Sequence, residues 1–597
     1  MESVAELNYR KGVALHGAGD FAGALAAYDA ALAVAPQLAA ALYNKAMVLI
    51  QLQRWQDALA VLDALVRTNP GIADAWNNRS GVLQALGRHE EALESIRHVI
   101  NLRPSDARAL YNAGLVLLIL KRFDEAQQFL TRALAADPSN GEILGSLVSA
   151  ALRACDWKTL EPLLPRLFSG VRNGTAVIAP LSLLALSDDA ILQRRCAELT
   201  TARSLATAAL GSGVPPMAQA AYRHDRIRIG YLSSDFGDHP VAAQIVGLLE
   251  RHDRSRFEIT GLFTGRADGS ARYNRVVKAC DHFRSIGSMG ARDAAALIRE
   301  AEIDILVDLN GQTLGGRPAI LKYRPAPVIA TFLGYAGTTG AGFVDYIIGD
   351  PHVTPFGLGP AMSEKIVQLP DCFWPSDPDL PEPEALTRAD AGLPPGAFVF
   401  CCFNSNHKIR PPMLDLWARL LKSVEGAVLW IRGGYPEMNA RFLEQAGSRG
   451  IAEERIVFAG RMESFAAHLG RQAQADLFLD TFPYNAHATA SDALWAGLPV
   501  VTLRGESFVS RVSSSLLANI GLAELVAESP EEYEAIALAL ARDRGRLTEL
   551  RLRLASARKS AALFDMDRFV KGIEAAYRQM QARSGQKPEA FRVPLSI

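Results

Sequence analysis

The sequence predicts an α-helical repeat superhelix followed by an α/β region of two Rossmann-like domains that face a cleft. Proline recurs every 34 residues in the first part of the chain, and short apolar runs alternate with helical patterns in the second. A stretch rich in Pro and Asp, residues 376–396, divides that second part. The chain has 597 residues, 49% of them hydrophobic and 21% charged, which is enough for several domains with full cores.

The bulk composition excludes several classes of protein. Lys+Arg 63 against Asp+Glu 64 gives a net charge of −1, so the basic footprint of bulk nucleic-acid binding is missing. The six cysteines form no CxxC pair, which favours reduced core thiols over a disulfide frame or a zinc site. There is no apolar signal segment at the N-terminus and no run of 18 apolar residues. We therefore expect a cytoplasmic protein without a nucleic-acid partner or a membrane span.

Residues 1–170 are predicted to be a repeat array of about four to five units. The 34-residue period is shared by prolines, alanines and small residues: Pro36, Pro70, Pro104 and Pro138; Ala24, Ala58, Ala92 and Ala126; Gly12, Ala46, Ser80 and Gly114. Small residues where two helices cross, with Pro ending the second helix, are the pattern of tetratricopeptide repeats. Such helix pairs bury their apolar faces only by stacking into a superhelix. A degraded fifth unit is expected over about 139–167.

An asparagine column follows the same period at Asn44, Asn78 and Asn112. Asn lowers helix propensity, so its recurrence on one face suggests a groove that holds an extended peptide by its backbone amides. The alternative is an Asn that bonds within its own helix.

After a helical connector over 171–225, with a helix at about 178–210, the first Rossmann-like lobe is expected at 226–380. Its strands are predicted at about 227–234, 258–263, 305–308 and 328–332, with helices to about 249 and at 271–279 and 291–301. Strands that alternate with helices predict a parallel doubly wound sheet, whose functional loops lie at the carboxyl ends of the strands. The polar loop that contains Asn310 follows one of these strands.

The second lobe is expected at 390–550, after the hinge at 376–396. Its strands are predicted at about 398–403, 427–431, 456–458, 477–479 and 499–502. One long final helix, about 532–581, is expected to close the fold, so that residues 551–597 form a C-terminal helix and tail.

Two loops of the second lobe carry candidate chemistry. In residues 475–497 a buried strand, a loop with His487 and a helix start follow one another, an order that binds phosphate because free N–H groups and the helix dipole point into the loop. An ordinary βα unit is the alternative. Lys408 ends the loop after the first strand, where it could neutralise a diphosphate or be a solvated charge. No dinucleotide fingerprint, P-loop or metal-ligand set occurs, so no metal is expected.

These motifs together resemble the catalytic region of the protein O-GlcNAc transferases. The matching stretches are GYLSSDFGDHP (230–240), DLNGQT with RPAPVIATFLGYAGTTG (308–313, 324–340), FNSNHKI (403–409) and NAHATASDALWAG (485–497). The resemblance implies the GT-B fold and inverting transfer of GlcNAc from UDP-GlcNAc to Ser or Thr hydroxyls of proteins. It implies no cofactor besides this donor, and an acceptor peptide guided by the repeat groove.

The resemblance also implies roles for single residues. His239 matches the family's active-site histidine, whose role as general base is disputed among family mechanisms, and Lys408 matches the lysine that neutralises the diphosphate. The other matched positions are His487, Ala488 and Thr489 for the phosphates, Asp492 for the ribose, His468 and Arg471 near the uracil, Leu333 and Gly334 beside the sugar, and His282 in the cleft.

Three alternatives to this reading stay open. Tyr484 stands where the animal enzymes carry a small residue beside the N-acyl group, so a plain hexose competes with GlcNAc, and Ser405 replaces a longer amide near the diphosphate. Related enzymes of the same architecture use GDP-fucose or UDP-glucose, although the fucosyl type lacks the histidine at 487. A repeat scaffold with an inactive transferase region is the third alternative.

Overall fold

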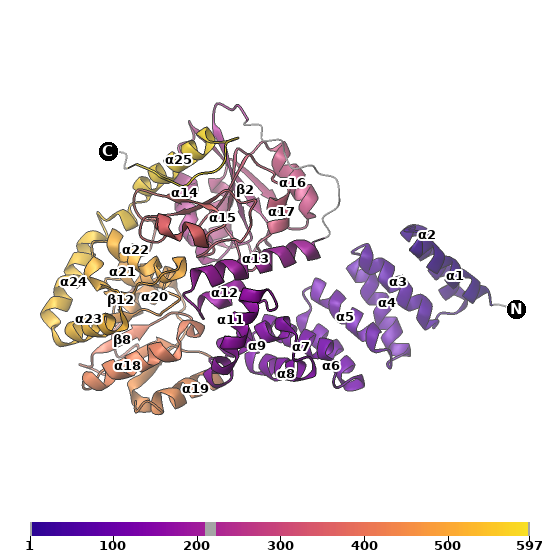
Figure 1. The fold of residues 1–597 in the computed structure, drawn as a ribbon, viewed down its shortest axis with the longest axis horizontal. Helices are drawn as coiled ribbons and strands as arrows, with labels where there is room; N and C mark the ends of the chain where they lie inside the picture. The colour runs from indigo at the N-terminus through magenta and orange to yellow at the C-terminus, as the bar shows by residue number, and fades with distance from the viewer. Residues whose placement is uncertain (1–2, 209–221, 595–597) are drawn as a thin grey trace. The chain divides into compact units, whose positions relative to one another are not determined.

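The computed structural model describes residues 3–208 and 222–594. The chain divides into two compact units, residues 1–154 with 158–170, and residues 155–157 with 171–597. In Figure 1 the first unit is the indigo and violet helical array, and the second is the α/β body that runs from magenta to yellow.

The first unit consists of antiparallel helix pairs: α1 (Val4–Gly17), α2 (Phe21–Val34), α3 (Ala39–Gln51), α4 (Trp55–Thr68), α5 (Ala73–Ala85), α6 (His89–Leu102), α7 (Ala107–Ile119), α8 (Phe123–Ala136) and α9 (Gly141–Arg153). The predicted small residues lie where the two helices of a pair cross. A Cβ on Gly12 would be 2.5 Å from Tyr28 Cε1, and one on Gly114 would be 2.5 Å from Leu130 Cγ. The period of small residues therefore reflects close helix contact.

The expected fifth unit is irregular in its second half. α9 is followed by α10 (Trp157–Leu160), a 3₁₀ turn η1 (Glu161–Leu163) and α11 (Leu164–Asn173). Pro162 lies in the 3₁₀ turn and Pro165 is the second residue of the next helix. Because proline has no N–H for the helical ladder, the second helix is divided here.

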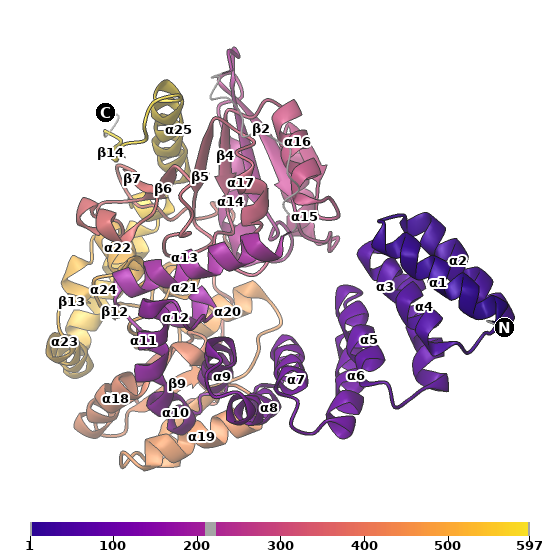
Figure 2. The same ribbon diagram turned by 45° about the vertical axis from the view of Figure 1, so that its right-hand side comes forward.

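The second unit contains an eight-stranded parallel sheet with the order β14-β7-β6-β5-β4-β1-β2-β3. Its strands are β1 (Ile227–Ser233), β2 (Phe257–Phe263), β3 (His282–Ser285), β4 (Ile305–Asp308), β5 (Val328–Thr331), β6 (Tyr346–Gly349), β7 (Lys365–Gln368) and β14 (Phe591–Arg592). The helices are α14 (Pro240–Arg251), α15 (Ala271–Ala279), α16 (Ala291–Glu300) and α17 (Pro318–Lys322), with the 3₁₀ turn η2 (Phe356–Ala361). Figure 2 shows β4, β5, β6 and β7 in sequence across this sheet.

A second parallel sheet of six strands has the order β10-β9-β8-β11-β12-β13. Its strands are β8 (Val399–Cys402), β9 (Val428–Arg432), β10 (Ile456–Ala459), β11 (Leu477–Leu479), β12 (Val500–Leu503) and β13 (Val526–Ala527). The helices are α18 (Pro411–Ser423), α19 (Pro436–Gly447), α20 (Phe465–Gln472), α21 (Ala488–Trp495), α22 (Val512–Asn519), α23 (Pro530–Arg542) and α24 (Arg544–Ala557). Short 3₁₀ turns are η3 (Asn406–Lys408), η4 (Glu453–Arg455), η5 (Phe508–Ser510), η6 (Ala523–Leu525) and η7 (Ala562–Phe564).

Both sheets reverse their strand order at one point. In the first, β1 pairs with β2 on one side and β4 on the other, and in the second, β8 pairs with β9 and β11. Ligands of open α/β sheets bind beyond the carboxyl ends of the strands at this point. The loops after β1, β4, β8 and β11 carry His239, Asn310, Lys408 and His487 in turn.

Two predicted helices are wrong in length. The final run at about 532–581 is divided into α23, α24 and α25 (Met566–Ala582), because Asp543 caps α24 through Arg546 N and Asp565 caps α25 through Arg568 N. The run at 178–210 is divided into α12 (Pro180–Leu184) and α13 (Ala190–Thr207), where Asp189 is the cap. Residues 209–221 of the expected connector lie outside the described residues.

The C-terminal segment returns to the first lobe. In α25, the Tyr577 hydroxyl lies 3.0 Å from the Tyr231 hydroxyl of β1, and β14 pairs with β7 at the edge of the first sheet. Figure 2 shows α25 and β14 near each other on this lobe. Residues 566–592 are therefore part of the first lobe's packing.

Candidate active site

A cavity of about 430 Å³ lies between the two lobes. The first lobe lines it with His239 and Pro240 of α14 and with Arg272 and Arg275 of α15, and the second with Phe465 of α20 and Ala488, Ser491 and Asp492 of α21. The linker from Trp374 to Pro381 forms a further wall. The cavity thus brings His239, Ala488 and Asp492 together from segments about 250 residues apart.

His239 is the N-cap residue of α14, directly after the loop that follows β1. The Val241 backbone N–H donates to its Nδ1 at 3.3 Å. Since Nδ1 accepts this bond, the neutral ring carries its proton on Nε2. Asp235 Oδ2 lies 3.9 Å from Nδ1, and 47% of the His239 side chain is exposed. The ring can therefore offer a donor from Nε2 without disturbing the cap.

Lys408 ends the 3₁₀ turn after β8, where its own N–H donates to Ser405 O at 2.9 Å. Its ammonium donates to Asn485 O at 2.9 Å and lies 3.7 Å from the centre of the Tyr484 ring. Desolvation lowers the pKa of Lys408 from 10.5 to about 8. The contacts of this cation are thus a carbonyl and an aromatic face, both of which leave the full positive charge in place.

His487 is the N-cap residue of α21, and Ala488 and Thr489 are the first residues of the helix. Nε2 of His487 is buried and has no hydrogen-bond partner among the described residues. Burial, helped by the charge of Lys408, holds the pKa of His487 well below 6.5, so the ring is neutral. Thr489 Oγ1 donates to Asn404 Oδ1 at 2.5 Å, which joins the start of α21 to the loop after β8. A buried, unpartnered ring nitrogen beside a helix start is suited to a ligand oxygen.

A third cluster lies on α20 and α21. Arg471 Nη2 lies 2.8 Å from His468 Nδ1, and His468 Nε2 lies 3.0 Å from Gln472 Nε2 and 3.6 Å from Asp492 Oδ2. Burial raises the pKa of Asp492, and the contact with His468 opposes this rise. Arg471 also lies 4.7 Å from the centre of the Phe403 ring and donates to Gly460 O at 2.5 Å. These side chains form one polar network at the end of the second sheet.

The loops after β4 and β5 are packed closely against each other. Leu333 has a φ of +69°, an uncommon value for a residue with a branched side chain, and a Cβ on Gly334 would lie 1.8 Å from Leu309 O. Asn310 is buried, accepts from Ser234 N at 2.8 Å and donates to Asp235 Oδ2 at 2.8 Å. Asn310 therefore fixes the loop that leads to His239.

His282 does not lie with these residues. It is the first residue of the edge strand β3, paired with Thr260, whereas the strand's carboxyl end is at Ser285. Half of its side chain is exposed, and Nε2 lies 3.4 Å from Glu258 Oε1. The expectation of a cleft position therefore fails, because no strand was expected at 282–285 and the direction of the chain there was not evident.

The asparagine column of the array connects neighbouring repeats. Asn44 Nδ2 donates to the Tyr9 hydroxyl at 3.2 Å, and the corresponding atom of Asn112 donates to Asn77 Oδ1 at 3.4 Å. Asn78 Nδ2 approaches Met47 Sδ at 3.2 Å. Each bond reaches back to the preceding repeat, so the alternative of bonds within one helix is wrong.

Several residues that contact the candidate site residues were not predicted from the sequence. Trp374 packs its ring 6.1 Å from that of His487, and Asn485 supplies the carbonyl that accepts from Lys408. Asp480 is completely buried after β11 and accepts from Ala486 N at 2.6 Å. A buried acid directly after an apolar strand is a signal that could have pointed to Asp480, whereas Trp374 carries none.

The described part of the chain contains neither a metal-binding cluster nor a membrane-spanning helix. Within residues 3–208 and 222–594 no set of three or more His, Cys, Asp or Glu side chains is arranged to hold a metal ion. Among those residues no helix has the length and hydropathy needed to cross a membrane.

Comparisons with known proteins agree with this geometry. A curated protein of Arabidopsis thaliana named "Probable UDP-N-acetylglucosamine--peptide N-acetylglucosaminyltransferase SEC" is 34% identical over 391 residues, which are 64% of this chain and 40% of that protein. The UDP-N-acetylglucosamine--peptide N-acetylglucosaminyltransferase of Caenorhabditis elegans is 29% identical over 471 residues, 60% of this chain and 41% of its own. The chain thus spans about two fifths of the length of the curated relatives it matches.

A solved structure matches most of both chains. An O-GlcNAc transferase of Thermobaculum terrenum, determined as a mutant, superposes with a TM-score of 0.66 at 29% identity and covers 92% of this chain and 98% of its own. Tetratricopeptide models match residues 9–73 and 71–139. The model of glycosyl transferase family 41 matches residues 215–380 and 379–573, more than half of the chain. With its two parallel sheets and the cavity between them, the chain belongs to glycosyl transferase family 41.

Proposed function

We propose that this protein is an inverting O-GlcNAc transferase that moves GlcNAc from UDP-GlcNAc to Ser or Thr hydroxyls of proteins. The single observation that carries the proposal is the pairing of Lys408 and His487 at the switch point of the second sheet. An ammonium and a buried ring nitrogen there flank the start of α21. The relatives' names supply the donor, and the family supplies the class of reaction.

In this proposal Lys408 and the α21 N-terminus stabilise the departing UDP. The leaving diphosphate gains negative charge as the bond to the sugar breaks, and fixed donors aimed at that charge lower the barrier. Ala488 and Thr489 lie in the first turn of α21, where backbone N–H groups lack helical partners, and the helix dipole adds to the charge of Lys408. His468, Arg471 and Asp492 would hold the nucleoside.

We assign to His239 the role of a hydrogen-bond donor toward the sugar or the acceptor. A general base needs a lone pair on the nitrogen that faces the substrate. The Val241 N–H occupies Nδ1, so Nε2 of the neutral ring carries a proton and has no lone pair to offer. This supports a positioning contact from Nε2 over abstraction of the hydroxyl proton.

We propose that the repeat array takes up the acceptor protein and that the protein works in the cytoplasm. Tetratricopeptide arrays present concave surfaces built from consecutive repeats. The six cysteines are free thiols, five of them buried, which favours a reducing compartment.

UDP-glucose is a second candidate donor, favoured by Tyr484. Its ring lies on the ammonium of Lys408 and 5.2 Å from the ring of His487, so it occupies space beside both proposed phosphate ligands. A smaller sugar without an acetamide would need less displacement of this ring.

The experiment is a metal-free binding and transfer assay with the full chain. Thermal shift with UDP, GDP and their sugars in EDTA should raise the melting temperature with the uridine ligands alone, since a ligand of the native state stabilises it. Labelled UDP-GlcNAc and a panel of Ser/Thr proteins should then give labelled protein. Lys408→Met should reduce the rate of transfer by about 10²–10³, and the exposed Lys422→Met on α18 is the matched control. Binding of GDP sugars, or a need for Mg²⁺ or Mn²⁺, would refute the proposal.

A further inference from the structure

The carboxylate of Asp188 lies in the connector, outside both lobes, and is hydrogen-bonded to the second lobe. Asp188, in the loop between α12 and α13, accepts four hydrogen bonds from the turn around η5. Glu506 N donates to its Oδ2 at 2.7 Å, and its Oδ1 accepts from Ser507 N at 3.1 Å and Ser507 Oγ at 2.6 Å. The fourth bond comes from Ser510 Oγ at 2.5 Å. Both serines are completely buried.

The turn is shaped to admit this carboxylate. A Cβ on Gly505 would lie 2.3 Å from Asp188 Oδ2 and 2.5 Å from Ser510 Oγ. Gly505 N donates to Ser510 O at 3.0 Å, which closes the turn around the carboxylate. Only glycine at 505 allows the approach of Asp188.

The same turn contacts the proposed donor loop. The carbonyl of Val509, in η5, accepts from Asn485 N at 3.3 Å. Asn485 in turn accepts from the ammonium of Lys408 at 2.9 Å. Asp188 is thus connected to Asn485 and, through its carbonyl, to Lys408 by a single turn of chain.

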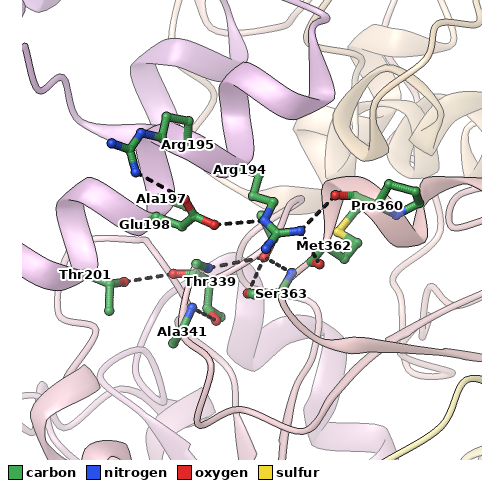
Figure 3. A network of polar contacts seen from close by, with 12 residues as sticks. Arg194, Arg195, Ala197, Glu198, Thr201, Thr339, Ala341, Pro360, Met362 and Ser363 are labelled. Carbon is green, nitrogen blue, oxygen red and sulfur yellow. Dashed lines mark hydrogen bonds and ion pairs between the residues drawn. The ribbon is translucent and has the colours of Figure 1, made fainter. Parts of the chain in front are cut away.

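Helix α13, which follows Asp188 in the chain, is hydrogen-bonded to the first lobe. On α13, Arg194 Nη1 donates to Pro360 O at 2.8 Å and to Met362 O at 3.2 Å, and Thr201 Oγ1 donates to Thr339 O at 2.8 Å (Figure 3). Gln312, in the loop after β4, donates to Thr201 Oγ1 at 2.7 Å. Asp188 therefore directly precedes a helix and its cap that are anchored to the loops of the first sheet.

We propose that Asp188 is a positioning residue for the donor site: by holding the η5 turn it fixes the Val509 carbonyl, and thereby Asn485, whose own carbonyl accepts from Lys408. This inference rests on the proposed function for its donor, a uridine diphosphate. Asn in place of Asp turns one backbone N–H, of Glu506 or Ser507, toward an amide NH₂, because the amide has a single acceptor oxygen. Two hydrogen-bond donors then face each other in a buried turn, and the unsatisfied N–H destabilises the conformation of that turn.

The test compares Asp188→Asn with Asp189→Asn in the full chain. Asp189 is the matched control because it is the adjacent carboxylate, caps α13 through Leu192 N at 2.9 Å and pairs with Arg172 at 3.0 Å. Calorimetric titration with UDP should show a dissociation constant about tenfold higher for Asp188→Asn, as expected from the loss of a buried charge-assisted bond. Asp189→Asn should bind as the unchanged protein does.

Hydrogen exchange without ligand gives a second readout that does not depend on UDP. Faster exchange over residues 504–511 in Asp188→Asn, with the array unaffected, supports the inference. Equal UDP affinity and equal exchange in this segment overturn it, and so do equal losses of affinity in both variants, which would indicate a general effect on folding. If the unchanged protein fails to bind UDP, the proposed function is wrong, while the exchange data still decide whether Asp188 holds the turn.

Discussion

Replacing Lys408 by Met tests the proposed chemistry most directly. Met keeps the length of the side chain and removes the charge. The fall of the pKa from 10.5 to about 8 means that the protein holds the ammonium roughly 3 kcal/mol less favourably than water does. A diphosphate beside Nζ restores this energy, and more of it as negative charge builds up on the leaving group. We therefore expect kcat to fall by about 10²–10³, the usual loss for one oxyanion donor.

The assay is steady-state transfer to a saturating acceptor, with UDP release measured over a range of donor concentrations. If Lys408 acts mainly in the transition state, kcat falls by more than the KM for the donor rises. Lys408→Arg keeps a charge but changes its shape, and should recover part of the activity. An unchanged kcat with a raised KM would show that Lys408 merely binds the donor, and the assigned role would be wrong.

Three further changes, one of pH and two of sequence, test the loops at the ends of the strands. Affinity for UDP should fall as the pH rises through about 8, because the Lys408 ammonium of the free protein loses its proton there; calorimetry in buffers of different ionisation enthalpy should detect proton uptake on binding at pH 8.5. Tyr484→Ala uncovers the Lys408 ammonium and should raise kcat/KM for UDP-GlcNAc relative to UDP-glucose, and an unchanged ratio would exclude Tyr484 from sugar selection. Gly334→Ala places a Cβ 1.8 Å from Leu309 O and should destabilise the fold by about 2 kcal/mol or more, whereas Gly342→Ala, which meets no atom within 4 Å, should leave the melting temperature nearly unchanged.

The central strands of both sheets could be predicted because buried strands consist almost entirely of apolar residues. Residues 305–308, 399–402 and 477–479 are buried at every position, and such strands appear as short apolar runs. Edge strands lack this signal. The exposed β3 reads His-Phe-Arg-Ser, and β14 has only two residues and pairs with a strand more than 200 residues earlier. Pairing across such a distance leaves no local pattern.

The residues of the candidate site likewise differ in whether the sequence could predict them. Lys408 and His487 lie in loops directly after buried strands, so the rule for parallel sheets indicated their positions before any resemblance was considered. Trp374 and Asp188 reach the site from the linker and from the connector. Their contribution depends on how these segments return to the lobes, which side-chain type and spacing do not encode.

The contacts of Lys408 explain how a cation can be kept ready for a diphosphate. A carboxylate in direct contact would neutralise the ammonium, and a diphosphate would then have to displace it. Here the direct contacts are the Asn485 carbonyl and the Tyr484 ring, while the nearby acid, Asp480, is buried and accepts from Thr502 Oγ1 at 2.7 Å and Ala486 N at 2.6 Å. Asp480 still favours the charged form of Lys408 through space. Among the described residues Lys408 therefore has a more distant acid that favours its charged form and no salt bridge at close range, as the proposed binding of a diphosphate and release of UDP would require.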